Sequence, residues 1–223
     1  MMSKVKILHG DITKLKVDAI VNYIIMEGYM IEIKKLSELD EEQVNQSFNV
    51  FVEGFSNVFS SITKDKDKLH RLFKNSFEYE MTYAYLLDGE AVGFMGLANC
   101  EKRPMKLNKE IFLETISGFA GKVVFATMNA AFEKLNPVGP GEIYIDYIAT
   151  SPEHRSKGIG TKLIEYVRDT LGYKHIELEV FSKNPRAKGF YERAGFKVIK
   201  IKKDFMMTLQ GFGRRIVMRL DIE

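Results

Sequence analysis

The hydrophobic positions of this chain follow two different periods, and each period predicts one type of element. Apolar residues recur at three- and four-residue steps from Val44 to Phe59, which predicts an amphipathic helix over residues 40–59. Alternating or short apolar runs beside turn residues predict strands instead. By these criteria we expect strands at residues 29–36, 81–87, 91–98, 142–150, 176–181, 196–202 and 216–221, and further helices at 65–74, 161–171 and 185–193.

Two features interrupt this succession. Asp88 and Gly89 lie between two apolar runs and predict a hairpin, because both residue types tolerate the positive φ of a tight turn. Residues 108–135 then carry apolar side chains at helical spacing, which predicts an inserted helix between the third and fourth strands, broken near Gly118–Gly121. The broad apolar stripe of this insertion needs a cover, either from the same domain or from a second subunit, so a homodimer is one expected arrangement.

The segment Arg155-Ser-Lys-Gly-Ile-Gly160 lies between the fourth predicted strand and the helix that follows it. Its two glycines allow the backbone to approach a ligand closely, and the start of the helix presents free N–H groups. These donors and the helix dipole favour an anion, for which a pyrophosphate is the usual example. The lysine-ending P-loop pattern and the three-glycine dinucleotide pattern are both absent from the segment, so neither of those nucleotide sites is predicted.

The strand ending Ile148-Ala-Thr150, followed by Arg-x-x-Gly-x-Gly, resembles the acetyl-CoA-binding motif of the GNAT superfamily of N-acetyltransferases. Residues Asn184 to Phe196 are similar to the second motif of that family, with Asn, Ala, Phe-Tyr and Gly-Phe at matching steps. The resemblance is sharpest over residues 143–200 and extends, by the order of elements, over residues 26–223. It implies an α/β (α+β) GNAT fold, with a mixed, mostly antiparallel sheet of about seven strands that is flanked by helices and splayed where the cofactor inserts.

The resemblance also implies a set of cofactor contacts. Acetyl-CoA would be the co-substrate, with its pantetheine arm along the end of the fourth strand and its pyrophosphate on the glycine-bearing loop. An asparagine before the helix 185–193 would bond the pantetheine or a water near the sulfur. The implied cofactor-binding residues are Ile148, Ala149, Thr150, Arg155, Ser156, Lys157, Gly158, Ile159, Gly160, Thr161 and Asn184.

Acetyl transfer to an amine needs a base for the amine, a donor for the thioester oxyanion and a proton for the departing thiolate. By resemblance, Tyr191 has the position from which GNAT enzymes often protonate the thiolate, and a phenol with a pKa of about 10 can donate at neutral pH. The base stays open. Glu179 matches a glutamate of the ribosomal-protein alanine N-acetyltransferases, Asp146 ranks beside it and Glu142 third, and all three could instead attract a cationic amine. Asp146 and Ile148 are expected to share one face of their strand.

Composition narrows the partners without changing this picture. The 223 residues are 45% hydrophobic and 28% charged, which suits one sizeable core, and a net charge of +3 argues against nucleic acid as a partner. No apolar run reaches the ~18 residues of a membrane span, so we expect no membrane partner and a cytoplasmic protein. The lone Cys100 and four separated histidines show no ligand spacing, so no metal is expected. A non-catalytic acyl-CoA sensor of the same fold is the alternative function.

Residues 5–22 follow a different pattern from the rest. Their sequence, with Asp11 in a Gly-Asp-Ile step and Asn22 closing a second apolar run, is similar to the opening strands of a macro domain, the ADP-ribose-binding module. The glycine-rich phosphate loops of that family do not follow. We therefore expect residues 1–25 to be a short leader rather than a complete domain, and residues 26–223 to form the acetyltransferase domain. ADP-ribose binding through the leader is a further alternative.

Overall fold

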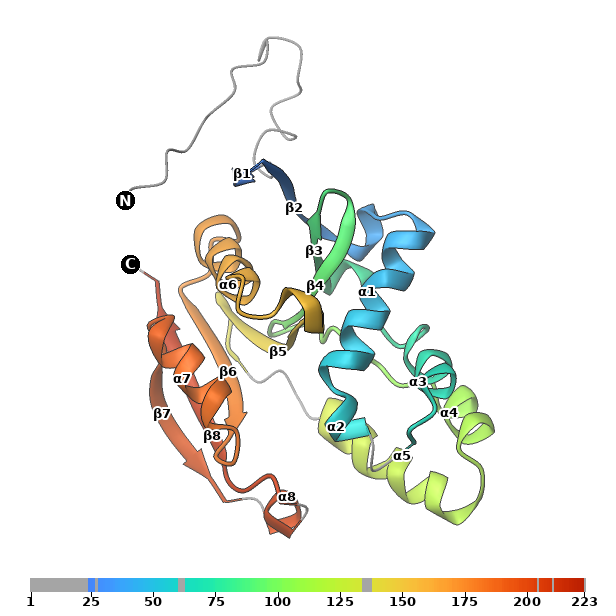
Figure 1. The fold of residues 1–223 in the computed structure, drawn as a ribbon. Helices are drawn as coiled ribbons and strands as arrows, with labels where there is room; N and C mark the ends of the chain where they lie inside the picture. Colours follow the sequence, from blue (N-terminus) through green and yellow to red (C-terminus); the bar gives the residue numbers. More distant parts are fainter. Residues whose placement is uncertain are drawn as a thin grey trace.

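The computed structural model describes residues 24–26, 28–59, 63–133, 138–203, 205–209 and 211–222. Its described strands form one sheet in the order β1-β2-β3-β4-β5-β6-β8-β7 (Figure 1). The strands are β1 (Ile24–Met26), β2 (Tyr29–Lys35), β3 (Thr82–Leu87), β4 (Glu90–Ala98), β5 (Glu142–Thr150), β6 (His175–Phe181), β7 (Lys197–Lys202) and β8 (Arg215–Asp221). The expected mixed, mostly antiparallel sheet is confirmed, because β5 and β6 form the one parallel pair among these strands.

Most predicted strands and α-helices agree with the structure within one or two residues, and two of the described strands and α-helices were not predicted. The helices are α1 (Glu41–Gly54), α2 (Ser56–Phe59), α3 (Lys66–Phe73), α4 (Lys109–Thr115), α5 (Gly118–Glu133), α6 (Ile159–Thr170), α7 (Pro185–Arg193) and α8 (Phe205–Leu209). The unpredicted elements are the three-residue β1 and the five-residue α8. The macro-like stretch at residues 5–22 lies outside the described residues, so that interpretation stays a prediction.

Local side-chain signals explain where the helices begin. Asp40 caps α1, with its Oδ1 accepting from the Gln43 N–H at 2.8 Å. Asp65, Asn108 and Asn184 cap α3, α4 and α7 in the same way. The hairpin prediction is also confirmed, because Asp88 and Gly89 both have positive φ between β3 and β4.

The predicted helix over residues 40–59 is interrupted at Phe55. Helix α1 ends at Gly54, and the short α2 follows after Phe55. A Cβ on Gly54 would lie 2.5 Å from the Ala149 Cβ, so this glycine allows the end of α1 to lie against the end of β5. Periodicity alone does not show this contact, because the partner strand is almost a hundred residues away in the sequence.

The insertion between β4 and β5 contains two helices rather than one. The predicted break falls at residues 116–117, between α4 and α5, with Gly118 at φ +83°. Phe112 on α4 is buried, while Val124 and Phe125 on α5 pack partly against the same core. The domain therefore covers part of the apolar stripe itself. Phe119 remains 83% exposed, and the homodimer stays a prediction.

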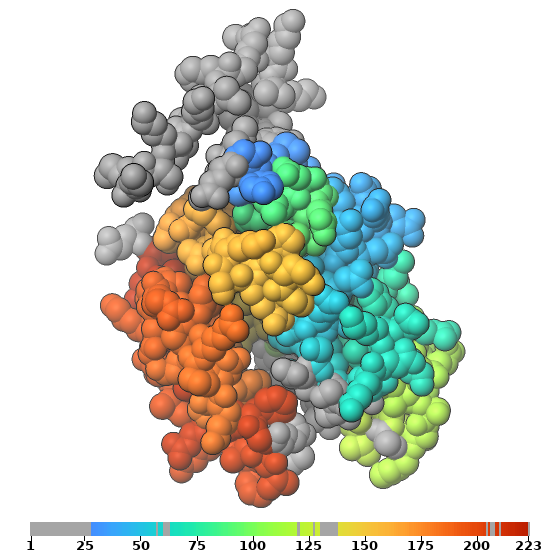
Figure 2. All heavy atoms as spheres, in the orientation of Figure 1, coloured from blue at the N-terminus to red at the C-terminus, as the bar shows by residue number. Residues whose placement is uncertain are grey.

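Two hydrophobic cores lie on opposite faces of the sheet. One packs α6 and α7 against the sheet, and we call it the α6 core; Leu163 and Tyr191 belong to it. The other packs α1, α3 and α4 against the other face, and we call it the α1 core; Phe51 and Phe112 belong to it. In Figure 2 the C-terminal segments (orange to red) gather on one side of the molecule and α1 to α5 (blue to yellow-green) on the other. No helix of the described residues is long and apolar enough to cross a bilayer.

A bulge in β5 changes which face its side chains take. Gly96 pairs with Tyr147 and Leu97 with Ile145, so Asp146 is left without an opposite residue on β4. As a result Tyr147 belongs to the α1 core, whereas Ile148 packs against the α6 core. The expected shared face of Asp146 and Ile148 is therefore wrong, because simple alternation does not continue through a bulge.

Replacing Gly96 tests this arrangement. The ring of the fully buried Tyr147 lies across Gly96, where an added Cβ would come within 2.1 Å of it. Gly96→Ala should therefore lower the free energy of unfolding by about 3 kcal/mol, measured by chemical denaturation. Gly189→Ala is the matched control, because its Cβ would meet nothing closer than an arginine tip at 3.4 Å. Equal stabilities of the two variants would contradict the packing argument.

Candidate active site

The strands β5 and β6 separate halfway along their length. Their parallel pairing ends with Ile145 opposite Leu178, although β5 continues to Thr150 and β6 to Phe181. Beyond that point β5 pairs only with β4, and β6 only with β8, among the described residues. One backbone edge of residues 146–150 is thus open to an extended ligand. This is the splay that the sequence led us to expect.

The first residue past the separation is a carboxylate on each strand. Asp146 follows Ile145 on β5, and Glu179 follows Leu178 on β6, so the register places the two side by side. Consistent with this, the charge of Glu179 contributes to raising the pKa of Asp146. The two candidate bases, which the sequence could not rank, therefore belong to one polar cluster where the sheet opens.

Asp146 is held by an arginine from the segment that follows β4. Arg103 donates from Nη2 to Oδ1 at 2.5 Å and from Nε to Oδ2 at 3.1 Å, a two-point ion pair. The side chains of Asp146 and Arg103 are 8% and 16% exposed. Burial raises the pKa of Asp146, and the arginine opposes that shift without cancelling it. Asp146 is thus a buried, fixed carboxylate.

The side chain of Glu179 is more exposed to solvent than that of Asp146. Its Oε1 accepts from Lys202 at 2.5 Å and its Oε2 from Arg215 at 3.2 Å. Both cations are about 40% exposed, and the Glu179 side chain is 16% exposed, twice the fraction of Asp146. Each carboxylate oxygen keeps a further lone pair after one such bond. Glu179 can therefore accept from a water or an amine as well.

Glu142, the third candidate, lies elsewhere. It stands at the start of β5, where its Oε2 accepts from the Gly139 N–H at 2.9 Å and its Oε1 lies 3.7 Å from an Arg219 nitrogen. Three residues of the strand separate it from Asp146 at the opening. Glu142 therefore stabilises the loop that precedes β5, and it does not belong to the polar cluster at the opening.

The candidate phosphate-binding loop, residues 155–160, includes two residues in the left-handed region and leads directly into α6. Gly158 has φ +80° and stands at the N-terminus of α6 without any side-chain cap, and Ser156 also has positive φ. Among the described residues, no backbone acceptor takes an N–H from residues 156–161, and the first helical bond runs from Lys162 to Gly158. These free donors, beside the exposed Lys157, fit an anion such as a pyrophosphate.

The two glycines of the loop have different roles. A Cβ on Gly158 would meet no atom within 4 Å, so its positive φ is what requires glycine. A Cβ on Gly160 would lie 3.0 Å from the Phe190 ring, so this glycine allows α6 to pack against α7. We expected both glycines to serve ligand approach, and for Gly160 the structure adds a packing contact.

Tyr191 lies in the α6 core on α7 and is 9% exposed. Phe190 and Phe196 hold its ring, with ring centroids 5.1 and 5.7 Å away. Burial raises the pKa of the phenol, so the hydroxyl keeps its proton through the neutral range. Within the described part of the chain its hydroxyl has no hydrogen-bond partner. Such a hydroxyl can donate to a ligand.

Asn184 caps a helix, in addition to the pantetheine contact that the resemblance implies. Its Oδ1 accepts from the Ala187 N–H at 3.1 Å and so caps α7. The amide Nδ2 remains as a donor. In the described residues, no group of three or more His, Cys, Asp or Glu side chains could hold a metal ion.

The sequence analysis did not predict the three cations that bind Asp146 and Glu179. Arg103, Lys202 and Arg215 come from the segment after β4, from the end of β7 and from the start of β8. Each looks like an ordinary surface charge, since nothing in its local pattern shows which carboxylate it meets. A pairing of distant strands brings them together, and single-sequence periodicity does not report that pairing.

Comparisons with known proteins point to one family. The acetyltransferase (GNAT) family model matches residues 48–196. The ribosomal protein bS18 alanine N-acetyltransferase of Salmonella typhimurium is 35% identical over 78 residues, which are 34% of this chain and 53% of that protein. A 5-NmdU N-acetyltransferase of Pseudomonas phage PaMx11 is 35% identical over 57 residues, 26% of this chain and 41% of that protein. The alignments thus span about half the length of these curated relatives.

Solved structures show the same fold at low sequence identity. The ribosomal-protein-S18-alanine N-acetyltransferase of Escherichia coli superposes with a TM-score of 0.51 and 18% identity, covering 87% of this chain and 95% of that one. A protein of Pyrococcus horikoshii superposes with a TM-score of 0.50 and 19% identity, covering 86% and 99%. At this identity the likeness shows the fold alone.

Proposed function

Because this chain belongs to the acetyltransferase (GNAT) family, we propose that it is an acetyl-CoA-dependent N-acetyltransferase that acts on a primary amine. The observation that carries the proposal is the opening between β5 and β6. It combines an open backbone edge, a loop of free N–H donors and two carboxylates at one point of the sheet. One relative is named for an alanine of a ribosomal protein and another for 5-NmdU, so the relatives do not identify the acceptor of this chain.

In the proposed reaction, residues 156–161 bind the pyrophosphate of acetyl-CoA, and the open edge of Ile148 to Thr150 takes the pantetheine arm. The amine attacks the thioester carbonyl, forming a C–N bond while the C–S bond breaks. A β5 backbone N–H stabilises the oxyanion, and Tyr191 donates its proton to the departing thiolate. Asn184 orients the arm through its free Nδ2.

For the base we propose Glu179, with Asp146 as its positioning neighbour. Both oxygens of Asp146 accept from one arginine that is only 16% exposed, which makes this carboxylate a fixed structural charge. Glu179 is more accessible, and its cations are half-exposed, so a water can reach it and carry the amine proton away. The same carboxylate would attract an ammonium group before deprotonation.

Turnover tests the proposal directly. The full chain is incubated with acetyl-CoA and an amine library, and free thiol and acetylated amines are measured by absorbance and mass spectrometry. We expect thiol release that depends on an added amine. Tight CoA binding without any amine-dependent thiol release would instead favour an acyl-CoA sensor.

A matched pair of glycines tests the cofactor loop. Gly158 and Gly172 stand at opposite ends of α6, both with positive φ and both with nothing near an added Cβ. Replacing either by valine imposes similar backbone strain, on the order of 1–2 kcal/mol. Gly158→Val should also lower CoA affinity at least tenfold by calorimetry, whereas Gly172→Val should bind CoA normally. Similar affinities for the two variants would remove the loop from the site.

A further inference from the structure

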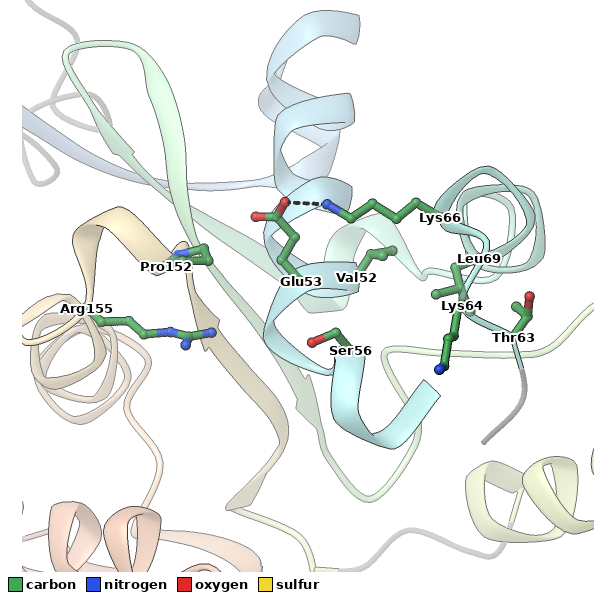
Figure 3. Close-up of a pocket in the computed structure, with 9 residues that line it drawn as sticks. All are labelled: Val52, Glu53, Ser56, Thr63, Lys64, Lys66, Leu69, Pro152 and Arg155. Atoms are coloured by element: carbon green, nitrogen blue, oxygen red, sulfur yellow. Dashed lines mark hydrogen bonds and ion pairs between the residues drawn. The ribbon is translucent and has the colours of Figure 1, made fainter. Parts of the chain in front are cut away.

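A cavity of about 480 Å³ opens beside the phosphate-binding loop, on the α1 side of the sheet. Its walls come from three segments: the end of α1 with the start of α2, the start of α3, and the turn after β5. Figure 3 shows Arg155 extending from that turn toward the end of α1, with Lys66 and Leu69 on α3 across the cavity from it. None of the proposed catalytic groups lines this cavity, although Arg155, one of the cofactor contacts that the resemblance implies, does.

The charged residues that line the cavity are mostly cations. The cavity is lined by Lys64, Lys66 and Arg155 against a single carboxylate, Glu53. That carboxylate is bound to Lys66 at 2.9 Å. Among the described residues, neither Lys64 nor Arg155 has an acidic partner. Two uncompensated cations on one cavity attract an anion, and each would gain a charge-assisted bond from it.

The remaining lining completes a site of this kind. Ser56 and Thr63 add hydroxyl donors, while Val52 and Leu69 form an apolar wall. The Thr63 oxygen accepts from the Asp65 N–H at 3.1 Å, which leaves its own proton for a ligand. An anionic group attached to an apolar or neutral body fits this combination.

We propose that this cavity binds a carboxylate or phosphate group carried by the acceptor. The inference rests on the proposed function, because it concerns the second substrate of the same reaction. Two arguments favour the acceptor over the cofactor. The free N–H donors at the start of α6 already provide for the pyrophosphate, and α6 packs on the opposite face of the sheet from α1 and α3. The acceptor would then be an amine with an anionic substituent, held by Lys64 and Arg155.

Inorganic phosphate is the probe for the test, titrated by calorimetry into the full chain. The titration is made with the cofactor site saturated, once with CoA and once with dephospho-CoA, which lacks the 3′-phosphate. Wild type is compared with Lys64→Ala and with Lys68→Ala, which removes an exposed lysine of α3 that does not line the cavity. We expect equal phosphate affinity with either cofactor, a roughly tenfold loss in Lys64→Ala and no change in Lys68→Ala.

Three outcomes would overturn the proposal. Undetectable binding would remove the site, and binding that ignores Lys64→Ala would indicate an adventitious ion only. Phosphate binding beside dephospho-CoA but not beside CoA would assign the cavity to the 3′-phosphate of the cofactor. Failure of the proposed function is seen separately, as absent CoA binding or absent thiol release, because the phosphate titration involves no turnover.

Discussion

The Tyr191→Phe variant is expected to lose about 10- to 10³-fold in kcat while its KM for acetyl-CoA hardly changes. The phenol would supply the proton for the thiolate, an interaction made only as the C–S bond breaks. Phenylalanine keeps the ring between Phe190 and Phe196 and removes only the hydroxyl. Because that hydroxyl bonds no described residue, the thermal melt should move little.

Tyr83→Phe is the control for this variant. Tyr83 is buried in the same core, its pKa is likewise raised by burial, and it stands on β3, two strands away from β5. It should keep full turnover. Steady-state kinetics and a melt on the same preparations decide the matter. A Tyr191→Phe enzyme with unchanged kcat would move the proton to a water and leave Tyr191 as part of the cofactor wall.

The Glu179→Gln variant should lose about 10²- to 10³-fold in kcat/KM near neutral pH. Glutamine keeps the volume and the hydrogen-bonding oxygen but cannot accept the amine proton. The loss should shrink as the pH rises toward the pKa of the acceptor amine, because solvent then supplies the neutral nucleophile. Stability should change by less than about 1 kcal/mol, since Lys202 and Arg215 are half-exposed and water can solvate them.

Asp146→Asn should show the opposite result, with a loss of stability and little loss of activity. This change leaves Arg103, only 16% exposed, without its carboxylate. Breaking a buried pair in this way should cost about 3 kcal/mol of unfolding free energy. The folded fraction should keep most of its turnover. If a fully folded Asp146→Asn protein were inactive and Glu179→Gln active, the two carboxylates would exchange roles.

Sequence patterns located the parts of this site that form locally. The start of α7 at Pro185 and the Asp88–Gly89 turn each depend on a few neighbouring residues, and both were predicted. The strand and helix around the phosphate-binding loop were predicted for the same reason. Their hydrophobic periods report which side of each element meets a core.

Contacts between distant segments were predicted poorly. Gly54 is required by the close approach of Ala149, and the bulge at Asp146 is followed by Tyr147 in the α1 core. Arg103 reaches Asp146 from the segment that follows the neighbouring strand β4. Each is a consequence of packing between elements that are far apart in sequence, and no single window of the chain contains both partners.

The sequence by itself determined the order of the elements, and it named the glycine-bearing loop before α6, Tyr191 and Glu179 as candidates for the site. Tertiary structure alone decided that Glu179 and Asp146 stand side by side, because the parallel register of β5 and β6 sets their separation from the last paired residues. The tertiary structure also decided that Asp146 is the more buried carboxylate and Glu179 the more accessible one. Burial and ion pairing depend on what surrounds a side chain in space, and the chain sequence states only what precedes and follows it.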